Sequence, residues 1–212
     1  MAQQARAGAA ARPEPLPLFP LQLVLFPGAR LGLKVFEVRY LDLVADCLRT
    51  RQPFGVVCLR SGIDTERKGV AFEDAGVLAH IDEVDAEQPG ILQLRCSGSS
   101  RFRISEPAQQ GDNGLWAARV APIAADPLRL PGPAMLPTVT ALAEAIAKLK
   151  QQGKEPFAAP YRLDDAGWVA NRWCELLPVS LAAKQRLMEL EDPALRLSLV
   201  DDYLRDKKVV GA

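Results

Sequence analysis

Residues 16–28 read LPLFPLQLVLFPG, and this stretch decides how the chain begins to fold. It is apolar and interrupted by prolines. Because a proline fixes φ and removes a backbone donor, the stretch suits an edge strand or an extended segment better than a helix. Its end, Phe26-Pro27-Gly28, is typical of a turn, since proline presets φ and glycine accepts a positive φ. The folded part is therefore expected to begin with extended structure.

Downstream of this stretch the spacing of apolar residues changes. Residues 31–37 alternate as a strand does. From Arg39 the period is helical, and the expected apolar face consists of Leu41, Val44, Ala45 and Leu48. This helix is expected to end near Arg51, because Pro53 follows.

Short runs rich in β-branched and apolar residues indicate further strands. A buried strand is expected from Phe54 to Arg60, followed by a mobile charged loop from Ser61 to Phe72. A hairpin turn is expected at residues 87–90, EQPG. The other expected strands are Gly76 to Asp85, Ile91 to Cys96, Arg101 to Ser105 and Trp116 to Pro122. Short strands with one early helix indicate a compact mixed barrel or sandwich.

The second half of the chain is helical throughout after a proline-rich segment. Apolar stripes predict helices around residues 139–149 and 165–177. Ser180 is expected to cap a helix over residues 181–190, and Asp192-Pro193 to start the last one. The chain is thus expected to be of the α+β class. Its expected parts are a disordered tail (1–13), a β-rich region (14–124), a Pro-rich linker (125–135) and a bundle of about four helices (136–207).

Composition narrows the classes of function. The 212 residues include 26 Lys and Arg and 26 Asp and Glu, so the formal net charge is zero. A nucleic-acid binder usually has a basic excess, which places that class at a disadvantage. No stretch approaches the roughly 20 apolar residues of a membrane span. Neither nucleic acid nor membrane is expected as a partner.

The cysteines and the single histidine argue against a metal site. Cys47, Cys58, Cys96 and Cys174 form no C-x-x-C pair, and His80 is the only histidine. Three of the four cysteines have apolar neighbours, where cysteine usually acts as a small core residue. Reduced thiols fit a cytoplasmic location, and no metal or other cofactor is expected.

No motif of an enzyme is complete in this sequence. There is no G-x-x-x-x-G-K-[ST] loop, since Lys148 stands where the first glycine should precede Gly153-Lys154. No two glycines are separated by a single residue, which excludes a G-x-G-x-x-G loop. His80 lies among apolar residues, and Ser180 with Lys184 is better explained by a cap and a solvated lysine than by a catalytic pair. We therefore expect no catalytic residues.

Several segments, taken in order, resemble one family. Residues 16–28, followed by FEVRY at residues 36–40, resemble the opening of the Lon protease N-terminal domain. Residues 76–81, GVLAHI, resemble that domain's glycine-led strand, and residues 101–104, RFRI, its arginine–phenylalanine strand. The family's helical end is resembled by residues 168–187. The resemblance covers about residues 14–207.

The resemblance implies a fold and a function. It implies a PUA-like pseudo-barrel followed by a helical bundle. In Lon this domain helps to select unfolded or tagged substrates and supports assembly. The ATPase and protease parts would have to follow, and this chain ends at Ala212. The sequence is therefore expected to be a solo bacterial version of the domain.

Candidate peptide-binding residues come from the same motifs. Phe19, Phe26 and Phe36 are expected either to line an exposed apolar groove or to belong to the core. Arg101 and Arg103 share one strand face, which is either a binding face or an ordinary exposed one. The remaining motif residues are expected to be structural: Pro20, Pro27, Gly28, Glu37, Arg39 and Tyr40.

Three functional hypotheses remain open. The first is a module that binds unfolded or tagged polypeptides, or a protease partner, and acts as an adaptor or regulator of proteolysis. The second is an RNA-binding module, because PUA-like barrels in other families bind RNA. The third is a cryptic hydrolase. A cleft with exposed apolar residues between barrel and bundle would support the first hypothesis, and a packed junction there would weaken it.

Overall fold

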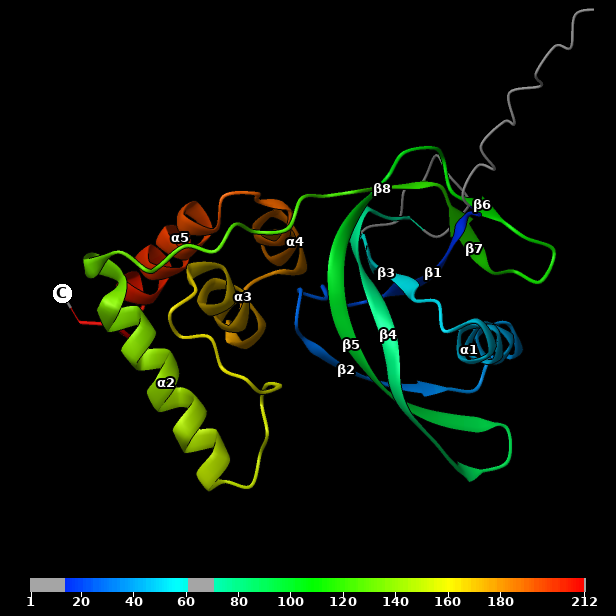
Figure 1. Ribbon diagram of the computed structural model, residues 1–212, viewed down its shortest axis with the longest axis horizontal. Helices are drawn as coiled ribbons and strands as arrows, with labels where there is room; N and C mark the ends of the chain where they lie inside the picture. Colours follow the sequence, from blue (N-terminus) through cyan, green and yellow to red (C-terminus); the bar gives the residue numbers. More distant parts are fainter. Residues whose placement is uncertain (1–13, 61–70, 212) are drawn as a thin grey trace, which may run out of the picture.

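The computed structural model describes residues 14–60 and 71–211 in two parts lying side by side (Figure 1). One part is a curved sheet with α1 (Val38–Thr50) against it, and the other consists of helices. The expected tail at residues 1–13 and most of the expected mobile loop lie outside the described residues. The α+β class, with strands first and helices second, is confirmed.

The sheet has eight strands within the described residues. Their order is β2-β5-β4-β3-β1-β7-β6, and β8 pairs with the far end of β5. Only β1 and β3 are parallel. The strands are β1 (Leu16–Leu21), β2 (Arg30–Val35), β3 (Phe54–Leu59), β4 (Phe72–Gln88), β5 (Ile91–Ile104), β6 (Gln109–Gln110), β7 (Trp116–Ala118) and β8 (Val120–Pro122).

The proline-containing stretch is extended, as predicted, and forms β1, but β1 does not lie at an edge of the sheet. It lies between β3 and β7. Neither neighbour spans the whole strand: β7 pairs with residues 16–18 and β3 with residues 18–21. Pro17 therefore lies beside β7 alone and Pro20 beside β3 alone. A proline in an inner strand is tolerated here because each one faces a single partner.

Strands β4 and β5 form one long hairpin, whereas the sequence indicated three separate strands. β5 continues through Ser97 to Ser100, where the sequence has no apolar alternation. Gly98 explains the continuation, because its N–H donates to the Ala29 carbonyl at 2.9 Å. A Cβ at Gly98 would lie 2.7 Å from the Phe26 carbonyl oxygen, so only glycine lets the two backbones approach this closely.

Helix α1 forms where predicted, but the face it buries is offset by one residue. Tyr40, Leu43, Val44 and Cys47 are buried, whereas Ala45 and Leu48 of the expected face are exposed. Both sets have the i, i+3, i+4, i+7 spacing and share Val44, so periodicity alone did not separate them. The contact that selects the observed face is Tyr40, whose ring stacks on Phe19 at 3.9 Å.

The helical part begins with a short 3₁₀ turn, Pro133–Met135, and continues with four α-helices. Three of the helices carry an N-cap side chain: Asp165 accepts from Gly167, Ser180 from Ala183 and Asp192 from Ala194. The caps at Ser180 and Asp192 were predicted and are confirmed. The helices are α2 (Leu136–Gln151), α3 (Ala166–Leu176), α4 (Leu181–Glu189) and α5 (Pro193–Asp206).

Candidate functional site

The three candidate phenylalanines do not lie together on the surface. Phe26 is fully buried, and Phe19 is buried between Tyr40 and Phe54. The sequence left two interpretations open, an exposed groove or the core, and Phe19 and Phe26 belong to the core. Phe36 differs, because 63% of it is exposed at the end of β2. Only Phe36 is available to a partner in this conformation.

The two candidate arginines are separated by the fold. Arg101 is only 3% exposed, and its guanidinium donates to the carbonyls of Met188, Leu190 and Ala124. It therefore does not belong to the exposed face that the sequence allowed. Arg103 is exposed and lies 3.3 Å from Glu189 of α4. Both arginines face the helical part, and Arg101 ties the sheet to it.

The turn at residues 26–28 is hydrogen-bonded to the helical part. The Pro27 and Gly28 carbonyls each accept a 2.6 Å hydrogen bond from Arg172 of α3. Gly28 adopts a φ of 75°, the left-handed region in which glycine is favoured. Arg172 is completely buried and also lies 2.7 Å from Glu175. The motif thus marks a contact between residues 144 positions apart.

The other motif residues lie around the start of α1. Glu37 and Arg39 form a 2.6 Å ion pair. Arg39 also donates to the Gly114 carbonyl at 3.2 Å, which connects α1 to the β6–β7 turn. Tyr40 packs on Phe19. These contacts stabilise the barrel, and the buried Arg39 Nε is left without a hydrogen-bond partner among the described residues.

A network of buried ionic side chains joins the sheet to the helices. Asp126 lies 2.7 Å from Arg101 and 2.6 Å from Arg196, so one carboxylate bridges two buried guanidiniums. Arg196 also donates to Asn171 of α3. Gln185 of α4 adds a hydrogen bond to the Ala75 carbonyl of β4. The sequence did not single out Asp126 or Arg196, because nothing local marks partners 70 positions apart.

Burial changes the ionisation of this junction. It lowers the pKa of Arg101 and that of Arg172, although both have carboxylate neighbours. Burial also raises the pKa of Glu175 to about 7, even with Arg172 and Lys184 beside it lowering that pKa. Desolvation therefore outweighs charge attraction at Glu175, and this carboxyl titrates near neutral pH.

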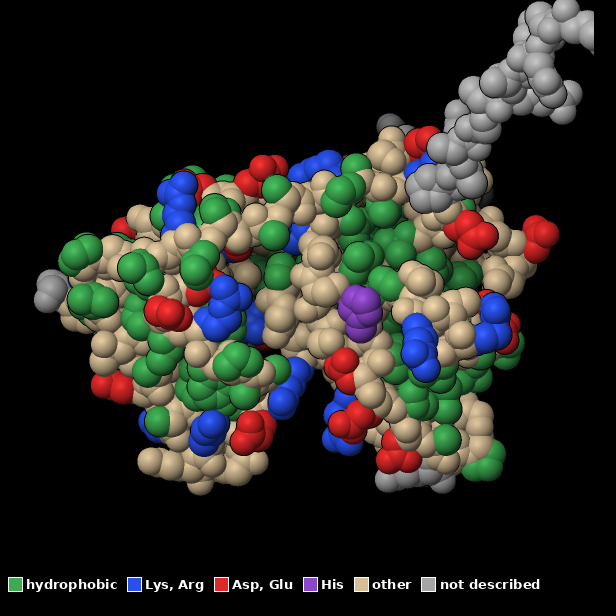
Figure 2. All heavy atoms as spheres, in the orientation of Figure 1, with side chains coloured by type: hydrophobic (Ala, Val, Ile, Leu, Met, Phe, Trp, Pro, Cys, Tyr) green, Lys and Arg blue, Asp and Glu red, His purple; other side chains and the backbone are tan. Residues whose placement is uncertain are grey.

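The hollow between sheet and helices is small, and polar and apolar residues both line it. It encloses about 250 Å³. The surface between the two parts is also indented in Figure 2, with charged side chains on both walls. Within the described residues, the apolar part of the hollow's lining is limited to Pro27, Ile123, Ala125 and Trp168. The polar lining of the hollow includes Ser99, Ser100, Arg101, Asp126, Arg162, Asp165 and Asn171.

An apolar groove lies instead on the helical part, between α4 and α5. Its volume is about 400 Å³, within the range of ligand pockets. Leu199 and Tyr203 are one turn apart on α5, and Leu187 faces them from α4. Leu199 is 44% exposed, so part of its apolar surface is available. The other lining residues are Leu177, Val179, Ser180, Ala182, Ala183, Arg186 and Val200.

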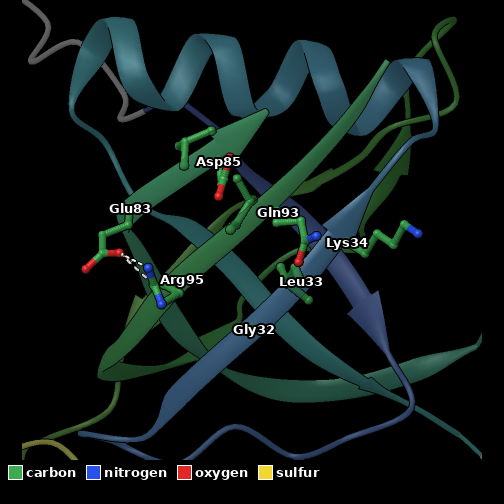
Figure 3. A pocket seen from close by; sticks show the side chains of 9 residues that line it. Gly32, Leu33, Lys34, Glu83, Asp85, Gln93 and Arg95 are labelled. Carbon is green, nitrogen blue, oxygen red and sulfur yellow. Dashed lines mark hydrogen bonds and ion pairs between the residues drawn. The ribbon is translucent and has the colours of Figure 1, made fainter. Parts of the chain in front are cut away.

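A second, polar hollow of about 490 Å³ lies on the outer face of β2, β5 and β4 (Figure 3). Glu83 and Arg95 form an ion pair across it at 2.6 Å. Lys34 of β2 extends away from that pair. Asp85 and Gln93 complete its polar side chains. The β4 side carries two carboxylates, one of which is paired with Arg95 of β5, and the β2 side carries Lys34.

The groups that could support catalysis are dispersed. Burial raises the pKa of Cys47 to about 11 and that of Cys96 and Cys174 to about 12, which disfavours the reactive thiolate. In residues 14–60 and 71–211, no three His, Cys, Asp or Glu side chains are placed to hold a metal ion. Ser180 is engaged as a helix cap, and Lys184 donates to the Glu175 carbonyl.

Comparison with known proteins places this arrangement in a family. The model of the ATP-dependent protease La (LON) substrate-binding domain matches residues 15–206. A search of curated proteins found no significant match. Over the described residues, no helix is long and apolar enough to cross a membrane.

Two solved structures are similar to this chain. The crystal structure of the Lon N-terminal domain protein from Xanthomonas campestris is 35% identical, with a TM-score of 0.73, and the match covers 90% of this chain and 98% of that one. The N-terminal domain of Lon protease from the Mycobacterium avium complex shares the fold at 16% identity, with a TM-score of 0.59 and coverage of 91% and 99%. The chain therefore belongs to the family of Lon substrate-binding domains.

Proposed function

We propose that this chain is a non-catalytic module that binds unfolded or tagged polypeptides and acts as an adaptor or regulator of a protease. Membership of a family of substrate-binding domains supports the recognition of polypeptides. The observation that carries the proposal here is the apolar groove between α4 and α5. Unfolded chains expose apolar side chains that folded proteins bury, and an open apolar groove offers those side chains a site out of water.

The groove favours this binding role over the alternatives. Its ionisable groups are Arg186 and Tyr203, which do not form an acid–base pair for hydrolysis. An RNA site would need clustered cations, whereas the zero net charge leaves no basic excess. We also propose a cytoplasmic location, because buried, reduced cysteines fit a reducing compartment.

A matched pair of α5 substitutions tests the groove. Leu199 lines it and is 44% exposed, whereas Leu195 lies one turn earlier, is 48% exposed and does not line it. We expect L199E to weaken binding of a reduced, alkylated and therefore unfolded protein at least tenfold, measured by fluorescence anisotropy. L195E should stay within twofold of wild type. Equal binding by both variants would refute the groove as the site.

The adaptor role has a separate test. Degradation of an unfolded substrate by purified Lon is measured with and without this chain. We expect the chain to change the rate and L199E to abolish the change, with L195E again as control. An unchanged rate would refute the role in proteolysis while leaving polypeptide binding intact. A gel shift of RNA that weakens steeply with salt would instead favour the RNA-binding alternative.

A further inference from the structure

Strand β2 ends the sheet with one side open. It pairs with β5 along residues 30–35, and none of the described strands pairs with its other side. An open strand edge presents backbone donors and acceptors that an additional strand can complete. Many proteins cover or shorten such an edge, whereas β2 is six residues long.

The hydrogen-bond pattern shows which residues face the open side. Gly98 donates to the Ala29 carbonyl and accepts from the Gly28 N–H, and the pairing then runs without a shift from Arg30 opposite Ser97 to Val35 opposite Leu92. Hydrogen-bonded and non-hydrogen-bonded pairs alternate along such a ladder, so from the Gly98–Ala29 bond onward Leu31, Leu33 and Val35 exchange bonds with β5. The backbone N–H and C=O groups of the intervening residues point outward. These residues, Arg30, Gly32 and Lys34, are all exposed.

The same three residues give this edge a distinct surface. Arg30 and Lys34 form no ion pair or side-chain hydrogen bond with the described part of the chain. Between them, a Cβ built on Gly32 would meet no atom within 4 Å. The edge is therefore basic at both ends and open in the middle.

The nearby carboxylates do not neutralise this basic edge. Glu83 and Asp85 both lie on β4, two strands away from β2, and Glu83 is engaged by Arg95 at 2.6 Å. An added strand would lie about 4.8 Å from β2 and roughly three times as far from β4. Charges separated by more than about 8–10 Å are largely screened at physiological salt, so Arg30 and Lys34 dominate the field at the edge.

We infer that the β2 edge binds an extended segment of a polypeptide as an added strand, with acidic side chains at alternate positions facing Arg30 and Lys34. The inference rests on the proposed function and adds a class of substrate to it. Backbone bonds would supply affinity independent of sequence, and the two cations would select for carboxylates. A second copy of this chain is a poorer occupant. Antiparallel pairing about Gly32 would set Arg30 against Lys34, and opposed like charges destabilise a sheet.

The first test uses a matched pair at Gly32. G32P removes an outward N–H that β5 does not use, whereas G32A keeps that N–H and meets no neighbouring atom. The probe is a labelled peptide that alternates Val and Glu over twelve residues. We expect G32P to bind it at least tenfold more weakly than wild type, and G32A to bind within twofold. Thermal unfolding of both variants checks that the sheet is retained.

The second test addresses charge and spacing. We expect K34E to weaken binding of the Val–Glu peptide at least fivefold and to improve binding of a Val–Lys peptide, while K148E on exposed α2 leaves both unchanged. A peptide of the same composition with Val and Glu in pairs should bind more weakly. Peptide binding should slow hydrogen exchange at the Gly32 amide, but not at Leu33, which already donates to β5.

Several results would overturn the inference. Equal peptide binding by G32P and G32A would exclude strand addition, and equal binding of acidic and basic peptides would exclude the charge selection. Dimerisation of wild type that is lost in G32P would identify a second copy as the occupant. If an unfolded protein still binds through Leu199 in any of these cases, the proposed function stands and only the β2 site fails.

Discussion

Two depressions of the molecule differ in the charge of their lining. Four charged side chains line the hollow between sheet and helices, whereas Arg186 is the one charged side chain among the described residues that line the groove between α4 and α5. The hollow encloses about 250 Å³ and is crossed by buried arginines that bond to carbonyls and carboxylates of both parts. The groove encloses about 400 Å³ and is lined mainly by apolar side chains that remain partly exposed. The charged groups of the hollow already have partners, whereas the exposed apolar surface of the groove has none among the described residues.

This difference separates the residues that hold the molecule together from those available for binding. A buried guanidinium is expensive to leave unpaired, so the junction is expected to stay closed. When a partner enters the apolar groove, the groove loses only its contact with water, and binding is favoured because apolar surface is removed from water. The residues that most clearly identify the family, such as Pro27 and Gly28, belong to the first group. In this chain, the family motif at Pro27 and Gly28 therefore identifies residues that stabilise the fold.

The largest expected effect comes from breaking the junction at Arg172. R172M leaves the Pro27 and Gly28 carbonyls and Glu175 without their buried cation, which should cost about 3–5 kcal/mol of unfolding free energy. R162M is the control, because Arg162 lines the same hollow but 52% of its side chain is exposed. It should cost less than about 1 kcal/mol. Urea unfolding followed by tryptophan fluorescence measures both, and equal costs would show that the junction does not depend on Arg172.

An intermediate effect is expected from the titration of Glu175. Its pKa is raised from 4.5 to about 7, so its contribution to stability is fully present below about pH 4.5 and is lost as the pH rises through 7. Between pH 5 and pH 8, the unfolding free energy of wild type should fall by about 2 kcal/mol relative to that of E175Q.

Urea unfolding at both pH values measures this shift. N171A is the control, since Asn171 is a buried neighbour on α3 that does not titrate, and its difference from wild type should stay constant. A difference between E175Q and wild type that also stays constant would mean that Glu175 does not titrate in this range.

The smallest effect on stability is expected in the groove. L199A removes a side chain that is already 44% exposed, so it should cost less than about 1 kcal/mol. L197A on the same helix removes a fully buried side chain and should cost about 2–5 kcal/mol. Thermal or urea unfolding compares the two. If L199A were as destabilising as L197A, the groove would be part of the core, and its contrast with the junction would disappear.

Local patterns in the sequence predicted much of the fold. The caps at Ser180 and Asp192, the turn at Gly28 and the helix after Val38 follow from the chemistry of a few neighbouring residues. Errors arose where a distant contact decides. The buried face of α1 depends on Tyr40 stacking on Phe19, and β5 continues through Gly98 because the backbone near Phe26 approaches it.

The candidate site was harder to predict than the fold. Phe19, Phe26 and Arg101 stood out because they lie in motifs, yet all three are buried. The groove residues did not stand out, because Leu199 and Tyr203 have the spacing of any apolar helix stripe. Whether such a stripe is covered depends on which helices pack around it, and that is not encoded in the spacing.

The sequence by itself determined that a strand-rich part precedes a helical part, where the Gly28 turn and the caps at Ser180 and Asp192 lie, and the family to which the chain belongs. These features rest on propensities, caps and turns that act within a few residues. The tertiary structure alone decided that Arg101 and Arg172 join the two parts, that Leu199 stays exposed, and that β2 ends the sheet with a basic, open edge. Burial and pairing are properties of packed neighbours, and those neighbours lie up to 145 positions apart in the chain.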